Sequence, residues 1–418
     1  MSFYLLPRTP LFIYKQIEYK DTENSPKIVI SQSLSYFLYN IKEKITNKEK
    51  QWDIFKKYTN PYEYIHTVVP MKKKSVSKHK PLSRSYFKMI EIINTFHIHY
   101  KEPIQTFHLA EGPGGFIEAI VKMRNCKEDF YIGMTLLDEN KNDSNIPAWK
   151  KSEYFLKSNP NVILENGLDH TGNILSLSNF EYVVKKYPSK MDIITADGGF
   201  DFSMDFNQQE IFIGKLLFAQ IAYALCLQKR RGKFILKMFD SFMNHTIDLL
   251  YILSSFYEKV YIMKPQTSRY ANSEKYIVCI GFLYDNHTEY YPYLYRCFES
   301  MLINQETDPL RFLNTNVSNL FMKKIEEYNA IFGQKQIQNI HFTMSLIENK
   351  TKYDKIDLLI KTNVQKSVDW CIKYAIPYNV LNMGLNIFLK NTNSNDIVSV
   401  VEKKADVDGA VDDEEDKK

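Results

Sequence analysis

Four charged side chains lie in, or directly next to, predicted helices and strands. Lys237 lies inside the apolar run "FILKMF", where an unpaired cation would be costly. Asp197 follows the buried run "DIITA", Lys88 lies on the helix "SRSYFKM", and Glu274 precedes "KYIVC". Lysines beside carboxylates can orient a hydroxyl and move its proton. Taken singly, each residue also fits an ordinary role as a surface or strand-end charge.

A glycine-rich turn, "TFHLAEGPGGFIEAIV", connects a predicted strand to a predicted helix. Gly112, Gly114 and Gly115 would let the backbone approach a ligand, and the free N–H groups of the helix would face it. A phosphate-binding loop needs a lysine and a serine or threonine here, but Phe116 and Ile117 follow instead. The spacing is also tighter than a dinucleotide fingerprint. With Glu111 before it, the turn suits S-adenosylmethionine, and a turn built only for packing is the alternative.

Alternating strands and helices should position these residues. Strand-like runs alternate with helical runs from residue 106, which predicts an α/β fold with a mostly parallel, doubly wound sheet. The last two predicted strands follow each other too closely for a crossover helix, so the last should pair antiparallel. The expected strands are 107–111, 130–136, 161–165, 191–199, 232–239, 259–265 and 274–284.

Four segments are predicted along the chain: an N-terminal extension (1–80), the α/β domain (81–287), a mainly helical region (288–395) and an acidic tail (396–418). Helical patterns in the third segment cover 318–332, 339–349 and 364–376. The tail is dense in carboxylates and predicted to be disordered. The helical region carries no recognisable chemistry, and binding of a protein partner is our expectation for it.

Composition indicates a soluble globular protein with a net charge of +5. We expect no membrane-spanning run, and the scattered, odd-numbered cysteines predict reduced thiols in a cytosol-like compartment without a metal site. Residues 71–84 form a basic run that could neutralise RNA phosphates, with a solvated loop as the alternative. Its candidate RNA-binding residues are Lys72, Lys73, Lys74, Lys78, Lys80 and Arg84.

Seven segments in order resemble the FtsJ-like ribose 2′-O-methyltransferases, and most closely their Adrift-type, cap-specific branch. These segments, within residues 60–285, are "NPYEYIH", "SRSYFKM", "EGPGGF", "YIGMTL", "TADGGF", "LKMFD" and "KPQTSRYANSEKYIVC". The resemblance implies a Rossmann-like methyltransferase fold and S-adenosyl-L-methionine as cofactor. It also implies a catalytic tetrad of Lys88, Asp197, Lys237 and Glu274.

The same resemblance implies a cofactor site around the glycine turn, formed by Glu111, Gly112, Pro113, Gly114, Gly115, Phe116 and Asp197. Many FtsJ-like proteins have an acid after the second strand for the cofactor ribose, whereas this chain has Thr135. Asp138 is a candidate for the ribose, and Asp169 for the adenine end. The identity of the ribose ligand is therefore open.

By the resemblance, the substrate is RNA, expected to be capped mRNA methylated on its first transcribed nucleotide. Lys237 would act as base if its pKa fell from about 10.4 towards 7–8, with Lys88 orienting the hydroxyl and Glu274 holding Lys237. Nearby carboxylates oppose such a fall, so its net sign is open. The likeness extends to a viral member of the family, which implies action in the host cytoplasm and packaging in the virion. The alternatives are a methyltransferase for uncapped RNA, a degenerate fold serving as an RNA-binding or virion structural module, and a dehydrogenase.

Overall fold

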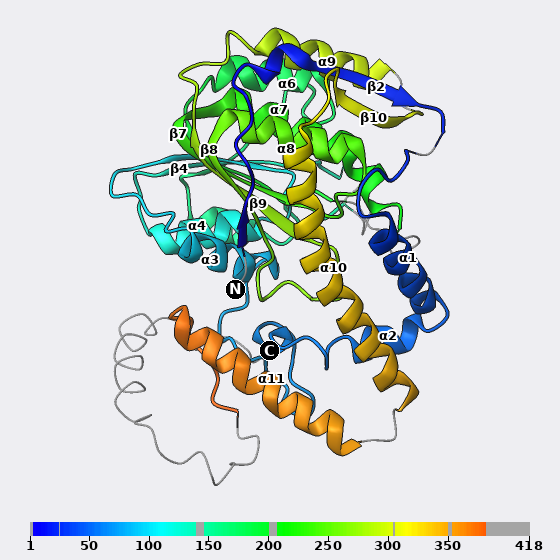
Figure 1. Cartoon of the computed structure of the whole chain (residues 1–418). Helices are drawn as coiled ribbons and strands as arrows, with labels where there is room; N and C mark the ends of the chain where they lie inside the picture. The colour runs from blue at the N-terminus through cyan, green and yellow to red at the C-terminus, as the bar shows by residue number, and fades with distance from the viewer. Residues whose placement is uncertain are drawn as a thin grey trace. The chain divides into compact units, whose positions relative to one another are not determined.

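Figure 1 shows a computed structural model of the chain, which describes residues 3–24, 26–138, 146–199, 207–303, 306–349 and 353–381. The chain divides into two compact units. The larger contains residues 1–60 and 81–352, and the smaller contains residues 61–80 and 353–418. The predicted acidic tail, 396–418, lies outside the described residues, as does the end of the predicted helical region.

The larger unit is built on an eight-stranded sheet in the order β1-β8-β9-β7-β6-β3-β4-β5. Its strands are β1 (Phe3–Leu5), β3 (Gln105–Leu109), β4 (Phe130–Met134), β5 (Val162–Leu164), β6 (Met191–Ala196), β7 (Gln228–Met238), β8 (Tyr257–Met263) and β9 (Lys275–Phe282). The five strands from β7 to β5 are parallel, and β9 is antiparallel to both β7 and β8. This confirms the predicted mostly parallel sheet with an antiparallel last strand.

Strand order reverses between β3 and β6, because the chain runs from β3 outward to β5 and then returns to the other side of β3. Loops that leave the carboxyl ends of β3 and β6 therefore diverge, and ligands of such sheets bind in the crevice between them. The glycine turn follows β3 and Asp197 follows β6. The topology thus brings these two predicted site segments to one edge of the sheet.

Helices cover both faces of the sheet (Figure 1). On one face lie α3 (Ser85–Thr95) and α4 (Gly115–Arg124), and on the other lie α6 (Leu177–Lys186), α7 (Gln209–Leu227) and α8 (Asn244–Phe256). The short helix α5 spans Glu153–Ser158. Strands covered on both sides are apolar along their whole length, as in "DIITA" of β6, where the last four residues are buried.

Helix α7 is long and apolar enough to cross a membrane by length and composition, contrary to the expectation that no such run exists. Its most apolar 18-residue stretch is 89% buried inside the fold. The Phe218 ring, for example, stacks on Phe312 with 4.8 Å between ring centroids. Burial of the helix on all sides explains its composition, since no polar face is needed.

The N-terminal and C-terminal parts of the larger unit fold together around this core. β2 (Ile17–Thr22) pairs antiparallel with β10 (Asp308–Leu313) in a second sheet. β10 is a strand within the region beyond residue 288 that was predicted to be mainly helical, and the sequence did not indicate it. The remaining elements are η1 (Ile13–Gln16), α1 (Gln32–Thr46), α2 (Glu49–Phe55), α9 (Tyr291–Ile303) and α10 (Asn319–Glu348). The two helical patterns predicted at 318–332 and 339–349 form one continuous helix, α10.

In the smaller unit, η2 (Glu63–Ile65) and the loop after it are joined to the segment that follows α11 (Tyr353–Lys373). The Lys78 N–H donates to the Pro377 carbonyl at 2.9 Å, and the Asn379 N–H donates to Val76 at 2.7 Å. The lysines of the basic run, Lys72, Lys73, Lys74, Lys78 and Lys80, are exposed in this unit.

One buried carboxylate, Asp248 of α8, attaches β10 to the larger core. Its Oδ2 accepts hydrogen bonds from Arg311 Nε at 2.7 Å and from the Phe312 and Leu313 N–H groups at 2.9 and 3.2 Å. Its side chain is fully buried. Removal of such an acceptor leaves a cation and two backbone donors without their partner.

We therefore expect Asp248→Ala to lower the free energy of unfolding by about 3 kcal/mol. The denaturant midpoint of the whole chain measures this. Asp285→Ala is the control, because it removes an ion pair with Arg230 whose side chains are both more than half exposed. That control should change the free energy by less than about 0.5 kcal/mol. Equal shifts in the two variants would contradict the assigned role of Asp248.

Candidate functional site

The glycine turn after β3 is shaped by close contacts that exclude larger side chains. Gly114 has a φ of +103°, which L side chains rarely adopt, and it precedes the first residue of α4. A Cβ on Gly112 would lie 2.4 Å from the Ala148 carbonyl oxygen. The turn therefore needs glycine at both positions, and it directs the N-terminus of α4 toward the edge of the sheet.

Glu111 stabilises this turn through contacts with α4 and with two strands. Its buried carboxylate accepts hydrogen bonds from the Ile117 N–H at 3.0 Å and from Thr195 Oγ1 at 2.9 Å, and it lies 3.0 Å from His108 Nδ1. The carboxylate is thus engaged by α4, β6 and β3. Its assignment to the cofactor stays a prediction, and on this geometry Glu111 would act by fixing the turn.

A hollow of about 560 Å³ opens beside the turn, in the size range of small-molecule sites. It is lined by residues from α3 and from the ends of β3, β4, β6 and β7. Four predicted site residues share it: Lys88, Gly112, Asp197 and Lys237. Arg84 also lines the hollow, although the sequence placed it with the basic run. Glu274 joins the group through Lys88.

Lys237 and Asp197 form one charged pair at this edge. Lys237 Nζ donates to the Asp197 carbonyl oxygen at 2.6 Å and lies 3.3 Å from its Oδ1. The Tyr276 hydroxyl donates to the same Oδ1 at 3.2 Å. Both charged side chains are about seven-eighths buried, and their remaining exposure is consistent with access from the hollow.

Lys88 and Glu274 form the second pair, with Lys88 Nζ 2.8 Å from the carboxylate. Ser268 Oγ donates to Glu274 Oε1, also at 2.8 Å. Burial lowers the pKa of Lys88, and the Glu274 and Asp197 carboxylates only partly oppose this. Burial alone would raise the pKa of Glu274, but the ammonium groups of Lys88 and Lys237 outweigh it and hold that pKa well below its usual value.

The pairing differs from the expected one, in which Glu274 holds Lys237. Antiparallel pairing of β7 and β9 places Tyr276 opposite Lys237 and Lys275 opposite Met238. Glu274 therefore lies beyond the end of this ladder, where it binds Lys88 of α3. Asp197 is instead the carboxylate that holds Lys237.

The other cofactor candidates occupy supporting positions. Asp138 is bound to Lys150 with 2.5 Å between charged atoms, and Asp169 Oδ1 accepts hydrogen bonds from Thr171 and Asn179. Gly172 and Asn173, close to Asp169 in sequence, line the hollow. Thr135 lines it too, and its Oγ1 lies 3.4 Å from the Gly112 nitrogen. The assignments of Asp138 to the ribose and of Asp169 to the adenine end stay predictions.

Pro113 and Phe116, also predicted for the cofactor site, attach the turn to the surrounding protein. The Pro113 carbonyl accepts a hydrogen bond from Ser152 Oγ at 2.5 Å. Phe116 is fully buried, and its ring centroid lies 5.7 Å from that of Tyr276. The structure thus adds Tyr276 and Ser268 to the site. Their sequence signal is weak, because a tyrosine in a strand and a serine in a loop are both common.

Comparisons with known proteins point to one family of methyltransferases. Residues 81–282 match the family model of the FtsJ-like methyltransferases. "Cap-specific mRNA (nucleoside-2'-O-)-methyltransferase 1" of Trypanosoma cruzi is 31% identical over 245 residues, which cover 57% of this chain and 64% of that protein. "Cap-specific mRNA (nucleoside-2'-O-)-methyltransferase 2" of Drosophila melanogaster is 27% identical over 232 residues, covering 51% and 32%.

A third relative is named as inactive. This "Inactive cap-specific mRNA (nucleoside-2'-O-)-methyltransferase 1B" of Caenorhabditis briggsae is 27% identical over 282 residues, which cover 63% of this chain and 31% of that protein. The chain thus spans less than two thirds of each of these relatives. The family match indicates S-adenosylmethionine as the methyl donor. Gly112 lines the hollow without a side chain, and this open backbone fits such a ligand.

We expect Gly112→Ala to weaken binding of S-adenosylmethionine about tenfold or more, because the added Cβ displaces the Ala148 backbone and with it the adjacent Pro147, which lines the hollow. Calorimetric titration of the whole chain with S-adenosylmethionine measures the affinity. Gly281→Ala is the control, since Gly281 lies in β9, where an added Cβ meets the flexible Glu258 side chain and not backbone atoms. An unchanged affinity in Gly112→Ala would remove the turn from the cofactor site.

Proposed function

We propose that this chain is an S-adenosylmethionine-dependent ribose 2′-O-methyltransferase that acts on the first transcribed nucleotide of capped mRNA. The observation that carries the proposal is the shared hollow, in which Lys88, Asp197 and Lys237 line one cavity with Gly112 of the turn. Relatives named as cap-specific mRNA methyltransferases support the choice of RNA and of the ribose.

In this proposal the bound cofactor supplies an activated methyl group. The ribose hydroxyl oxygen forms the new bond to the methyl carbon, the carbon–sulfur bond breaks, and the hydroxyl proton must leave. As a neutral amine Lys237 would receive that proton, and as an ammonium it would only orient the hydroxyl, because its Nζ borders the hollow while Asp197 fixes its position. Alignment of hydroxyl and methyl group can contribute as much as proton removal.

Lys88 acts as the second cation. Its pair with Glu274 keeps an ammonium group at the hollow, although burial disfavours the charge. Lys88 would then donate to the ribose oxygen and direct it along the reaction axis.

Two other functions compete with this one. A methyltransferase for uncapped RNA would use the same side chains, because none of them distinguishes a cap. A degenerate fold that serves as an RNA-binding or virion structural module is a real alternative, since one relative of 27% identity is named as inactive. The presence of both ion pairs, Lys88–Glu274 and Lys237–Asp197, favours an enzyme, because a structural module would not require them at the hollow.

We also propose a place of action. The order of the motifs resembles the FtsJ-like methyltransferase of African swine fever virus. On that resemblance we propose that the chain acts in the host cytoplasm and is packaged in the virion. Binding of a protein partner by the helical region beyond residue 288 stays part of the proposal.

Methyl transfer to short RNAs tests the function. The whole chain is incubated with labelled S-adenosylmethionine and matched capped or uncapped RNAs, and the modified ribose is located by nuclease digestion and mass spectrometry. Methylation of the first transcribed nucleotide of the capped RNA alone is the expected result. Equal methylation of the uncapped RNA would favour the first alternative, and no transfer to either would favour the second.

We expect Lys237→Met to lower the methyl-transfer rate by about 100-fold or more, while S-adenosylmethionine still binds. Methionine retains much of the lysine's length but neither its charge nor its proton acceptor. Lys233→Met is the control, because Lys233 lies on the same strand and rests over the Tyr100 ring instead. Full activity of Lys237→Met would exclude Lys237 from the reaction.

A further inference from the structure

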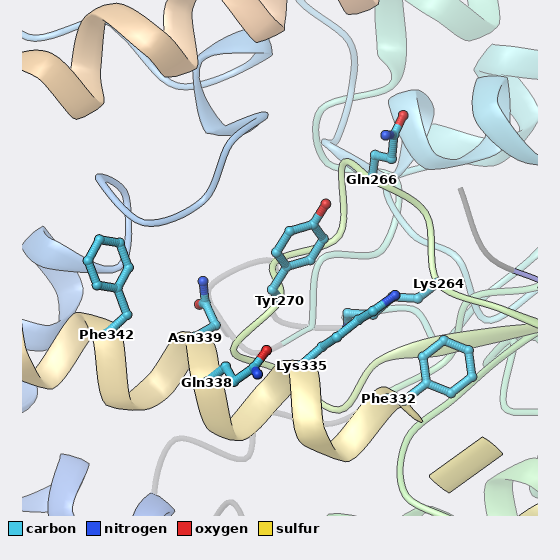
Figure 2. A pocket seen from close by; sticks show the side chains of 8 residues that line it. All are labelled: Lys264, Gln266, Tyr270, Phe332, Lys335, Gln338, Asn339 and Phe342. Carbon is cyan, nitrogen blue, oxygen red and sulfur yellow. The ribbon is translucent and has the colours of Figure 1, made fainter. Parts of the chain in front are cut away.

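A second hollow, of about 520 Å³, lies between α10 and the segment that connects β8 to β9 (Figure 2). All of its lining residues belong to the larger unit. The connecting segment contributes Lys264, Gln266 and Tyr270. None of its lining residues is shared with the hollow at the glycine turn.

One side of α10 forms the opposite wall. Phe332, Lys335, Asn339 and Phe342 recur at intervals of three, four and three residues, which places them on one helical stripe. Figure 2 shows Phe342 and Asn339 projecting from α10 toward the side on which Tyr270 lies. Gln338 completes this wall.

The chemistry of the lining suits a nucleotide. Lys335 supplies a cation and no carboxylate lines the hollow, so an anion is favoured, although burial lowers the pKa of the second lining lysine, Lys264, to about 7. Tyr270 and Phe342 offer ring faces on which a base can stack. The amides of Gln338 and Asn339 have both donors and acceptors, as the edge of a base requires. An acidic peptide would use the lysines but would leave the rings and amides without a matching group.

The connecting segment also borders the proposed reaction site. Lys264 Nζ donates to the Glu274 carbonyl at 2.7 Å, and Ser268 Oγ donates to the Glu274 carboxylate at 2.8 Å. Arg84, which lines the first hollow, donates to the Thr267 carbonyl at 3.2 Å. One face of the segment therefore supports the tetrad, while Lys264, Gln266 and Tyr270 line the second hollow.

Rigid attachments keep this wall in place without a ligand. Glu91 accepts hydrogen bonds from the Gln266 and Thr267 N–H groups at 2.7 and 2.8 Å. On α10, Gln336 donates to the Ala271 carbonyl at 3.1 Å. Lys264 also donates to two acceptors of Asn272, so its amino group is held inside the wall. Lys335 is the exposed lysine of the pair and the one free to move toward a phosphate.

We propose that this second hollow binds a nucleotide of the RNA substrate that flanks the reacting ribose, with its base stacked on Tyr270 and its phosphate at Lys335. The inference rests on the proposed function for the identity of the RNA as substrate. It adds a second point of attachment, which fixes how the strand runs away from the tetrad along α10.

Binding of an uncapped fluorescent hexanucleotide RNA to the whole chain tests this without turnover. Tyr270→Ala should raise the Kd about tenfold, whereas Tyr270→Phe, which keeps the ring, should stay near the unsubstituted value. Lys335→Ala should weaken binding and reduce the slope of log K against log salt by about 0.7. Lys323→Ala is the matched control, because Lys323 is an exposed lysine of α10 outside the hollow.

Two further readouts separate this inference from the proposed function. Affinity for S-adenosylmethionine and the thermal midpoint should not change in the variants. Methyl transfer should show a raised KM for RNA with little change in kcat. Failure of the unsubstituted chain to transfer a methyl group would count against the function alone, since the RNA Kd is measured independently. Unchanged RNA affinity in Tyr270→Ala and Lys335→Ala would overturn the inference. It would also be overturned if these variants lost affinity for a polyglutamate peptide but not for RNA.

Discussion

The proposed site depends on the burial of two ammonium groups beside two carboxylates at one edge of the sheet. Burial of either lysine alone would cost free energy, because it removes the hydration that stabilises the ammonium charge. Asp197 and Glu274 make that burial possible by each holding one lysine. Loss of charge on either carboxylate is therefore expected to change the position of its lysine and, with it, the shape of the hollow.

Much of this site could be predicted from the sequence, for a topological reason. The carboxyl ends of parallel strands meet at one edge, so residues after β3, β6 and β7 had to lie close together. The glycine turn was recognisable because Phe116 and Ile117 exclude a triphosphate loop and its spacing excludes a dinucleotide loop. Which carboxylate binds which lysine was not predictable, since it depends on the register of β7 against β9, where Tyr276 rather than Glu274 faces Lys237.

Long-range pairings account for the rest of what the sequence did not reveal. β10 contains a proline and no clear alternation, and it is a strand only because β2 pairs with it. Residues 61–80 join the segment after α11 through backbone hydrogen bonds that span about 300 positions, as between Lys78 and Pro377. The apolar composition of α7 fits both a membrane-spanning helix and a buried core helix, and only the surrounding structure distinguishes the two. In each case the missing information lay in a distant partner, not in the local pattern.

Both strands of the N-terminal segment have partners that are synthesised much later. β1 pairs with β8 at residues 261–263, and β2 pairs with β10 at residues 308–313. On the ribosome these first strands must therefore wait, with their hydrogen-bonding edges open, until most of the chain has emerged. At a synthesis rate of about 5–20 residues per second, that delay lasts on the order of ten seconds to a minute. The beginning of the chain is thus among its last parts to fold, which makes it the place where chaperones would have most time to act.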